Sequence, residues 1–270
     1  PEGEDAELPA LCPCADGTAL HGLSRRESTK RARHKSWVRA LALLVTLAWP
    51  ASASAGAQPA GMRLSDGRTF SHWAHPQRAA SVWRLPSQAS RWVARIHYLT
   101  EDGFPEVYLV LRRFTDRDGS RWLQIRIPMR PKWRTGWVRD SALGPLYRVQ
   151  TRLEVDRGRL HATLYRSGRR IWRSPIGVGK ASTPTPAGQF WIREKFTVAN
   201  PGGPYGPRAF GTSDYSSISD WPGGGVIGIH GTNEPYLIPG RPSHGCIRVP
   251  NDAISRLYRL MPIGTPMQVR

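Results

Sequence analysis

The chain has 270 residues, and 39 Lys and Arg residues against 20 Asp and Glu residues give it a formal net charge of +19. Such a basic excess indicates anionic partners, but nucleic acid is not favoured, because helix-turn-helix, zinc-finger and aromatic RNA-binding patterns are all missing from the sequence. The 27 glycines and 24 prolines separate short runs rich in Val, Ile, Trp and Tyr, which predicts an all-β protein.

The N-terminal part is typical of an exported protein. A basic cluster at residues 31–35 is followed by an apolar stretch at 40–49 and a run of small residues at 51–55. This order predicts a secretory signal that ends at Ala55, so residues 1–55 are left out of the fold prediction. The apolar stretch spans about 15 Å as a helix, roughly half of a hydrocarbon core, and does not favour a membrane span. An uncleaved N-terminal anchor is the alternative.

Most of the net charge lies after the predicted signal. Residues 56–270 keep 32 basic and 14 acidic residues, a net charge of +18. We expect an exported protein of this charge to reside in the cell wall or periplasmic space and to meet anionic wall polymers or a membrane surface. Solvated arginines in a generally arginine-rich protein are the alternative interpretation.

Residues 81–144 are predicted to form a small β-barrel after a polar linker at 56–80. Gln124 and Arg126 alternate with apolar neighbours, which is typical of a half-buried strand. The sequence WLQIRIP, followed by TGWV, resembles the bacterial SH3-like domains that are often fused to cell-wall enzymes. The three predicted strands are residues 107–111, 122–127 and 136–138.

A second β domain is predicted for residues 145–270. It contains one predicted helix at 252–260, with Asn251 or Asp252 as its N-cap. The proline- and glycine-rich run at 200–207 is long enough to be a lid or a flap that lines a substrate site. The predicted strands are residues 151–155, 160–165, 171–173 and 189–192.

Cys246 is the only cysteine outside residues 1–55. A thiol is mostly protonated at neutral pH, and because the thiolate is the nucleophile, a nucleophilic cysteine needs a base. His244 lies two residues away in the same segment, and His230 belongs to a different predicted strand. Either histidine is a candidate for the base.

Glycines next to these residues leave the backbone accessible. The carbonyl of Gly231 is placed to fix the tautomer of His230, and Gly245 leaves room for the amides of residues 244–246 to meet an oxyanion. Zinc binding by the cysteine and two histidines is an alternative, although no fourth ligand stands at metal spacing. A buried structural cysteine is another.

The sequences IHGT at 229–232 and SHGCIR at 243–248 resemble the signature of the L,D-transpeptidase (YkuD) family, and TPTPAG at 183–188 is also similar. The resemblance covers residues 146–270 and implies a β-sandwich that remodels peptidoglycan. It implies that the cysteine attacks the peptide bond after the L-centre of a diamino acid in a stem tetrapeptide and releases D-Ala. The amine of another stem peptide then resolves the acyl-enzyme as a 3→3 crosslink, and carbapenems are expected to acylate the same cysteine.

The resemblance also implies a role for each matching residue. Cys246 is the nucleophile, His230 is the base and the Gly231 carbonyl orients that base. His244 and Gly245 shape the oxyanion hole. The residues implied or considered for substrate binding are Ser243, Arg248, which stands where many members carry Asn, and Tyr205 in the flap.

Three other functions stay open. An L,D-carboxypeptidase would use the same acyl-enzyme with water as the acceptor, and the motif does not separate the two. A cysteine endopeptidase of the cell wall expects cysteine ahead of histidine in the chain, and here the order is reversed. A non-catalytic wall-binding protein is the non-enzyme alternative. No cofactor is implied, since thiol acyl transfer needs none, and the sequence leaves the oligomeric state open.

Overall fold

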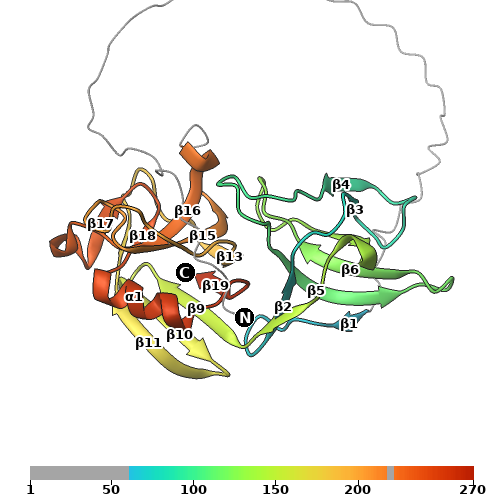
Figure 1. Ribbon diagram of the computed structural model, residues 1–270, viewed down its shortest axis with the longest axis horizontal. Helices are drawn as coiled ribbons and strands as arrows, with labels where there is room; N and C mark the ends of the chain where they lie inside the picture. The colour runs from blue at the N-terminus through green and yellow to red at the C-terminus, as the bar shows by residue number, and fades with distance from the viewer. Residues whose placement is uncertain (1–60, 218–221) are drawn as a thin grey trace, which may run out of the picture. The chain divides into compact units, whose positions relative to one another are not determined.

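The computed structural model describes residues 61–217 and 222–270 (Figure 1). The predicted secretory signal lies outside the described residues. The described residues belong to one compact unit and contain 19 strands and one α-helix. The prediction of an all-β protein with a short C-terminal helix is therefore confirmed. In the described part of the chain, no helix has the length and apolar character needed to cross a membrane.

The first sheet is antiparallel and has the strand order β4-β3-β7-β6-β5-β2-β8, with β1 on β5. Strands β4 and β8 end the ladder, so the pairing among the described strands is open, and the SH3-like resemblance stays a prediction. Apolar side chains on one face, among them Val82, Val110 and Leu123, form its core. The bounds are β1 Met62–Arg63, β2 Ser71–Ala74, β3 Ser81–Trp83, β4 Trp92–Arg95, β5 Tyr108–Thr115, β6 Arg121–Arg126, β7 Thr135–Arg139 and β8 Tyr147–Val149.

The half-buried pattern predicted for β6 is wrong, because both faces of this strand are covered. Leu123 is fully buried in the core, and Gln124 on the other face is only 8% exposed. Gln124 faces a cavity that it lines together with Leu109 and residues of later strands such as Gln189. The alternation of polar and apolar residues predicts that one face of the strand is buried. It does not reveal that later strands also cover the polar face.

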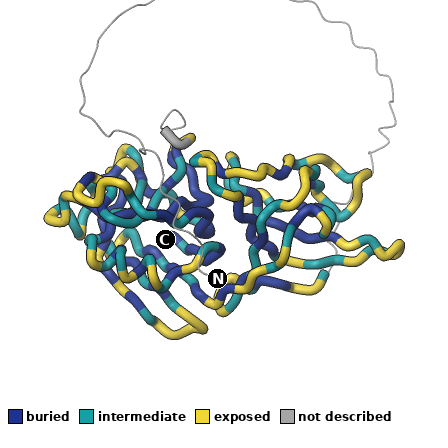
Figure 2. Tube along the Cα trace, in the orientation of Figure 1, coloured by how far each residue is buried: buried dark blue, intermediate teal, exposed yellow. Residues whose placement is uncertain are grey.

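Two further sheets enclose a second core (Figure 2). The five-stranded sheet has the order β11-β10-β9-β19-β13, and the six-stranded sheet has the order β14-β15-β16-β18-β12-β17. Leu153 of one sheet and Ile229 and Ile247 of the other belong to this core, which is the sandwich predicted from the sequence. The bounds are β9 Thr151–Asp156, β10 His161–Arg166, β11 Arg169–Pro175, β12 Gly177–Gly179, β13 Gly188–Trp191, β14 Phe196–Thr197, β15 Arg208–Tyr215, β16 Val226–His230, β17 Gly240–Ser243, β18 Ile247–Arg248 and β19 Pro266–Val269.

Helix α1 (Asn251–Leu260) packs Ile254 and Leu257 into the second core. Its N-cap is Pro250, and no side chain makes a capping hydrogen bond. The prediction that Asn251 or Asp252 caps the helix is therefore wrong. The side chain of Asn251 is used elsewhere, as described below.

A small apolar cluster joins the first sheet to the later strands. Trp191 packs against Val107 and Leu109, and its indole Nε1 donates a hydrogen bond to the Val107 carbonyl at 2.8 Å. This contact buries Val107 and Leu109, which belong to this cluster and not to the core of the first sheet.

Candidate active site

Strands β16 and β18 bring Cys246 and His230 to one place. The strands pair in parallel, with Ile229 opposite Ile247, so Cys246 lies beside Gly228. The Gly228 amide donates to the Cys246 Sγ at 3.4 Å. A Cβ on Gly228 would lie 3.8 Å from both the Cys246 Sγ and the His230 Cδ2. The missing side chain of Gly228 thus leaves a space that the thiol and the imidazole both border.

The imidazole of His230 is buried and held by the backbone. Its side chain is 5% exposed, and its Nδ1 lies 2.7 Å from the Gly231 carbonyl oxygen. Since a carbonyl only accepts, Nδ1 carries the proton, and Nε2 keeps its lone pair. Burial, followed by the charge of Arg248, lowers the pKa of His230 to about 4, although the Gly231 hydrogen bond opposes this shift. His230 is therefore a neutral base at physiological pH.

The flap predicted at residues 200–207 lies over this histidine. The ring of Tyr205 contacts the His230 imidazole edge-on, with the centroids 4.8 Å apart. Gly206 has φ +61°, and a Cβ there would come within 2.6 Å of the Gly231 Cα. Two glycines are needed at this crossing because only bare backbone fits so closely.

The side chain of Asn251 lies against both of these glycines. Its Oδ1 accepts a hydrogen bond from the Thr232 amide at 2.8 Å. A Cβ on either Gly206 or Gly231 would collide with this oxygen, at 2.3 Å and 2.4 Å. Asn251 therefore fixes the backbone just after His230, and it leaves no room for a side chain at Gly206 of the flap.

The SHGC turn is stabilised by hydroxyl groups. Ser243 Oγ accepts from the Gly245 amide at 3.1 Å and donates to the Cys246 carbonyl at 2.6 Å. Thr185 Oγ1 donates to the Gly245 carbonyl at 2.7 Å and accepts from the Gly179 amide at 2.9 Å. Gly245 has φ +129°, a conformation that favours glycine. Ser243 is buried, so its hydroxyl serves the turn itself.

Charged groups lie around the SHGC turn. Arg248 pairs opposite His230 across the strands and forms an ion pair with Glu234 at 2.7 Å. His244 is exposed, and partial burial, followed by the charges of Lys180 and Arg248, lowers its pKa. The structure thus places His230, Gly231, Tyr205 and Arg248 near Cys246, with His244 on the surface of the turn.

Residues 150–269 match the L,D-transpeptidase catalytic domain, YkuD. The putative L,D-transpeptidase YkuD of Bacillus subtilis is 34% identical over 123 residues, which cover 46% of this chain and 68% of that protein. The chain belongs to the L,D-transpeptidase family.

Two solved structures are also similar to this L,D-transpeptidase family member. The Ldtfm–avibactam carbamoyl enzyme is 30% identical with a TM-score of 0.34, and the match covers 49% of this chain and 52% of that chain. LdtMt1 in complex with imipenem is 16% identical with a TM-score of 0.37, covering 56% of this chain and 91% of that one. The family assignment rests on the sequence match to the catalytic domain.

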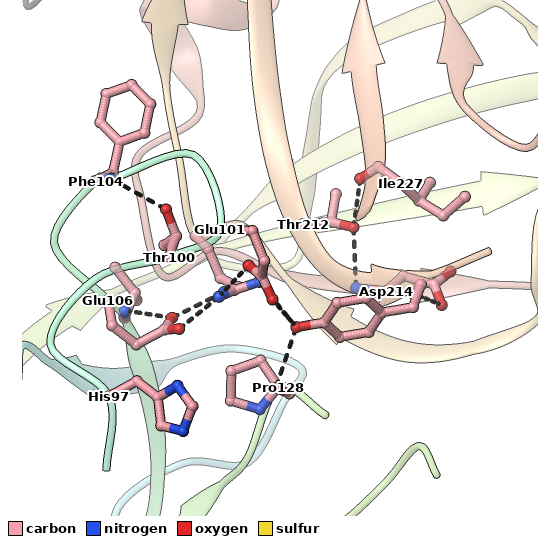
Figure 3. Close-up of polar contacts among 12 residues, drawn as sticks. His97, Thr100, Glu101, Phe104, Glu106, Pro128, Thr212, Asp214 and Ile227 are labelled. Atoms are coloured by element: carbon pink, nitrogen blue, oxygen red, sulfur yellow. Dashed lines mark hydrogen bonds and ion pairs between the residues drawn. The ribbon is translucent and has the colours of Figure 1, made fainter. Parts of the chain in front are cut away.

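In this member of the family, polar contacts support β16, the strand that ends at His230 (Figure 3). Thr212 of β15 donates its hydroxyl to the Ile227 carbonyl of β16 at 2.7 Å and accepts from the Asp214 amide at 3.1 Å. These bonds bridge the register shift between Gly211 and Tyr215, where the ladder to β16 is interrupted. Thr212 therefore ties β16 to its neighbour close to the catalytic candidates.

The same part of the molecule contains buried charges. Arg193 is 2% exposed and lies between Glu106, which it bonds through two nitrogens, and Glu101 at 2.9 Å. The Tyr215 hydroxyl donates to Glu101 at 2.6 Å (Figure 3). These contacts compensate the Arg193 charge, because a buried guanidinium is tolerated only when it is paired.

Several residues of the site were not predicted from the sequence. Thr185 and Asn251 act through side-chain hydrogen bonds to backbone groups that lie 60 and 19 positions away in the chain. The only available signal for Thr185 was its place in the TPTPAG run. No signal in the sequence pointed to Asn251 other than its position before a helix.

Proposed function

We propose that this chain is an exported L,D-transpeptidase that joins peptidoglycan stem peptides through a cysteine acyl-enzyme and releases D-Ala. The observation that carries the proposal is the shared space beside Gly228, bordered by both the Cys246 thiol and the His230 imidazole. Export rests on the basic, apolar and small-residue order at residues 31–55.

The first half-reaction transfers an acyl group to Cys246. The Sγ attacks the carbonyl carbon after the L-centre of the donor diamino acid, and its proton passes to the free nitrogen of His230. The C–N bond to D-Ala then breaks, and His230 returns the proton to the leaving amine. A thioester remains on Cys246.

The second half-reaction is the reverse chemistry with a new amine. The side-chain amine of another stem peptide attacks the thioester carbon, gives its proton to His230, and expels the thiolate, which takes that proton back. The product is a 3→3 crosslink. In both halves, the backbone amides around Gly245 are the candidates for stabilising the oxyanion.

The environment of His230 suits transient proton transfer. Because burial lowers its pKa to about 4, the resting imidazole is neutral and available as a base. The Gly231 carbonyl that accepts from Nδ1 at 2.7 Å stabilises the imidazolium for the short time that it exists. No buried acidic group is needed for this orientation.

A β-lactam would meet the same thiol. LdtMt1 was solved in complex with imipenem, and we expect a carbapenem to acylate Cys246 here. The four-membered ring opens as the C–N bond breaks, and the ring nitrogen takes the proton from His230. The adduct has the mass of the enzyme plus the intact inhibitor.

The test is mass spectrometry of disaccharide-tetrapeptide muropeptides incubated with the purified chain, with Cys246→Ala as the control. A dimer lighter than two monomers by one D-Ala supports transpeptidation. Tripeptide without dimer identifies an L,D-carboxypeptidase. The absence of both products and of a carbapenem adduct on Cys246 would favour a non-catalytic wall-binding protein.

A further inference from the structure

A cavity of 1280 Å³ lies apart from the catalytic residues. Its walls come from β1, β5 and β6 of the first sheet and from β9, β13 and β19 of the five-stranded sheet. None of the candidates around Cys246 lines it, since those residues belong to the six-stranded sheet and its loops. Any ligand of this cavity would therefore be held independently of the thiol chemistry.

Arginine dominates the charge of the cavity. Two carboxylates line it, and both are already engaged by protein groups. Asp66 Oδ1 accepts from the amides of Arg68 and Thr69 at 2.7 and 2.8 Å, while Glu154 is bonded by two of the arginines. The lining arginines are Arg63, Arg68, Arg112, Arg126, Arg152 and Arg270.

Four of these arginines have no acidic partner among the described residues: Arg63, Arg68, Arg112 and Arg126 form none of the ion pairs found there. Within residues 61–217 and 222–270, the side-chain hydrogen bonds of Arg63 and Arg112 all go to backbone carbonyls. Among the described lining residues, six arginines against two carboxylates leave an excess of four positive charges, and of the two carboxylates only Glu154 forms ion pairs with these arginines.

Arg126 shows that part of this charge is poorly compensated. Its two terminal nitrogens are held by Gln189, through the backbone carbonyl at 3.1 Å and the side-chain oxygen at 2.5 Å. Its Nε, like that of Arg152, is buried with no hydrogen-bond partner in the described part of the chain. Burial lowers the pKa of Arg126. A partly buried positive group that has no acidic partner among the described residues attracts an anion.

The neutral lining identifies the class of anion. Gln189 and Gln268 place amide groups among the arginines. Gln189 Oε1 accepts from Arg126 and Gln268 Nε2 donates to the Gly188 and Val269 carbonyls, so the Gln189 Nε2 and the Gln268 Oε1 are the amide atoms that suit a ligand with hydroxyls. Among the described residues that line the cavity, Phe190 is the only aromatic one, and it is 3% exposed. The bases of a nucleic acid would therefore find no exposed ring there on which to stack. We propose that this cavity binds an anionic glycan or polyol polymer that carries repeating phosphate or carboxylate groups.

The test uses fluorescently labelled oligomers and the full chain. Three probes of equal charge are compared by fluorescence anisotropy: a poly(glycerol phosphate) oligomer, an oligogalacturonate and a single-stranded DNA. The cavity variant is Arg68→Gln with Arg112→Gln, because both side chains are exposed and the fold should tolerate the change. The matched control is Arg169→Gln with Arg256→Gln, which removes the same charge from exposed positions outside the cavity.

We expect the cavity variant to bind the phosphate or carboxylate oligomer about tenfold or more weakly, since two charge-assisted contacts are lost. The control variant should keep the wild-type affinity. Tighter binding of phosphate than galacturonate, or the reverse, identifies the anionic group. Equal losses in both variants, no binding by the wild type, or DNA binding tighter than both oligomers would overturn the proposal. Unchanged alkylation of Cys246 in both variants shows that the thiol site is intact.

Discussion

The ring of Tyr205 stands edge-on to the imidazole of His230, with the centroids 4.8 Å apart. The flap that carries Tyr205 is fixed by the close crossing of Gly206 and Gly231. Burial is the largest cause of the low pKa of His230. The ring of Tyr205 thus contributes to the covering of the base, so we expect the position of the flap to influence the pKa of His230.

Replacement of Tyr205 by Ala should raise the pKa of His230 from about 4 toward its ordinary value of 6.5, because the imidazole gains solvent. NMR titration of the imidazole protons measures the change. Tyr205→Phe keeps the ring and should leave the pKa low. If the Ala variant also titrates near pH 4, the covering of His230 comes from elsewhere in the fold.

Cys246→Ala should abolish D-Ala release and leave the fold intact. Cys246 is half-buried at a turn whose hydrogen bonds come from Ser243 and Thr185, so the sulfur is not needed to hold the backbone. Release of D-Ala and the thermal unfolding midpoint are the two measurements. Residual D-Ala release above background would disprove the nucleophile assignment.

His230→Ala should slow alkylation of the thiol near neutral pH and lower D-Ala release by about 10²–10⁴-fold, the usual range for a general base. The rate of iodoacetamide labelling from pH 5 to pH 9 reports the effect. His244→Ala is the comparison, since His244 is exposed on the same turn. An unchanged labelling profile in His230→Ala together with a slowed His244→Ala would make His244 the base.

The sequence pointed to the candidate pair, Cys246 and His230, more clearly than to the residues around it. His230, Gly231 and Cys246 were found because a short motif encodes them, and the parallel pairing of β16 and β18 places them together. The predicted helix at 252–260 agrees with α1 (Asn251–Leu260) because an apolar face repeats along it. Local patterns of this kind are visible in one stretch of chain.

Contacts between distant segments were not predictable in the same way. Gln124 is covered by residues of later strands, and the Oδ1 of Asn251 bonds to Thr232 instead of capping its own helix. Both outcomes depend on tertiary packing. The alternation of polar and apolar residues and the preference of Asn for helix N-caps are local features, so they carry no information about contacts with distant segments. The charge count indicated an anionic partner, but only the structure gathers six arginines around one cavity.

Asp214→Asn should flatten the dependence of stability on pH. Burial, opposed by Lys132, raises the pKa of Asp214 from 3.8 to about 7, and one of its oxygens has no hydrogen-bond partner among the described residues. The folded state thus holds this proton more tightly, so its contribution to stability is complete below pH 3.8 and is lost as pH rises through 7. Between pH 5.5 and 7 one such group costs about 1–2 kcal/mol.

Urea unfolding at pH 5.5 and 7.5 measures this effect of Asp214. Burial also raises the pKa of Glu194 to about 7, so Asp214→Asn should keep part of the decrease and a further Glu194→Gln change should remove more of it. A wild-type free energy of unfolding that rises between these two pH values would contradict the assignment of either carboxyl.

Gly228→Ala should separate catalysis from folding. The new methyl would lie 3.8 Å from the Cys246 Sγ, 3.8 Å from the His230 Cδ2 and 3.5 Å from the Phe210 carbonyl oxygen, which are ordinary contacts. The fold should therefore accept it. The methyl would, however, occupy the space that the thiol and the imidazole share, where the attacked carbonyl must approach. We expect D-Ala release to fall by about 100-fold, as for other small displacements of reacting groups.

The matched control is Gly144→Ala, whose methyl would meet only the His75 carbonyl oxygen, at 3.7 Å, outside the site. Both variants should unfold at the wild-type temperature. Labelling of Cys246 by small iodoacetamide should persist in Gly228→Ala even as D-Ala release falls, because the reagent needs less room than a stem peptide. Wild-type D-Ala release in Gly228→Ala would show that the substrate does not enter over this glycine, and that thiol and base meet along another face.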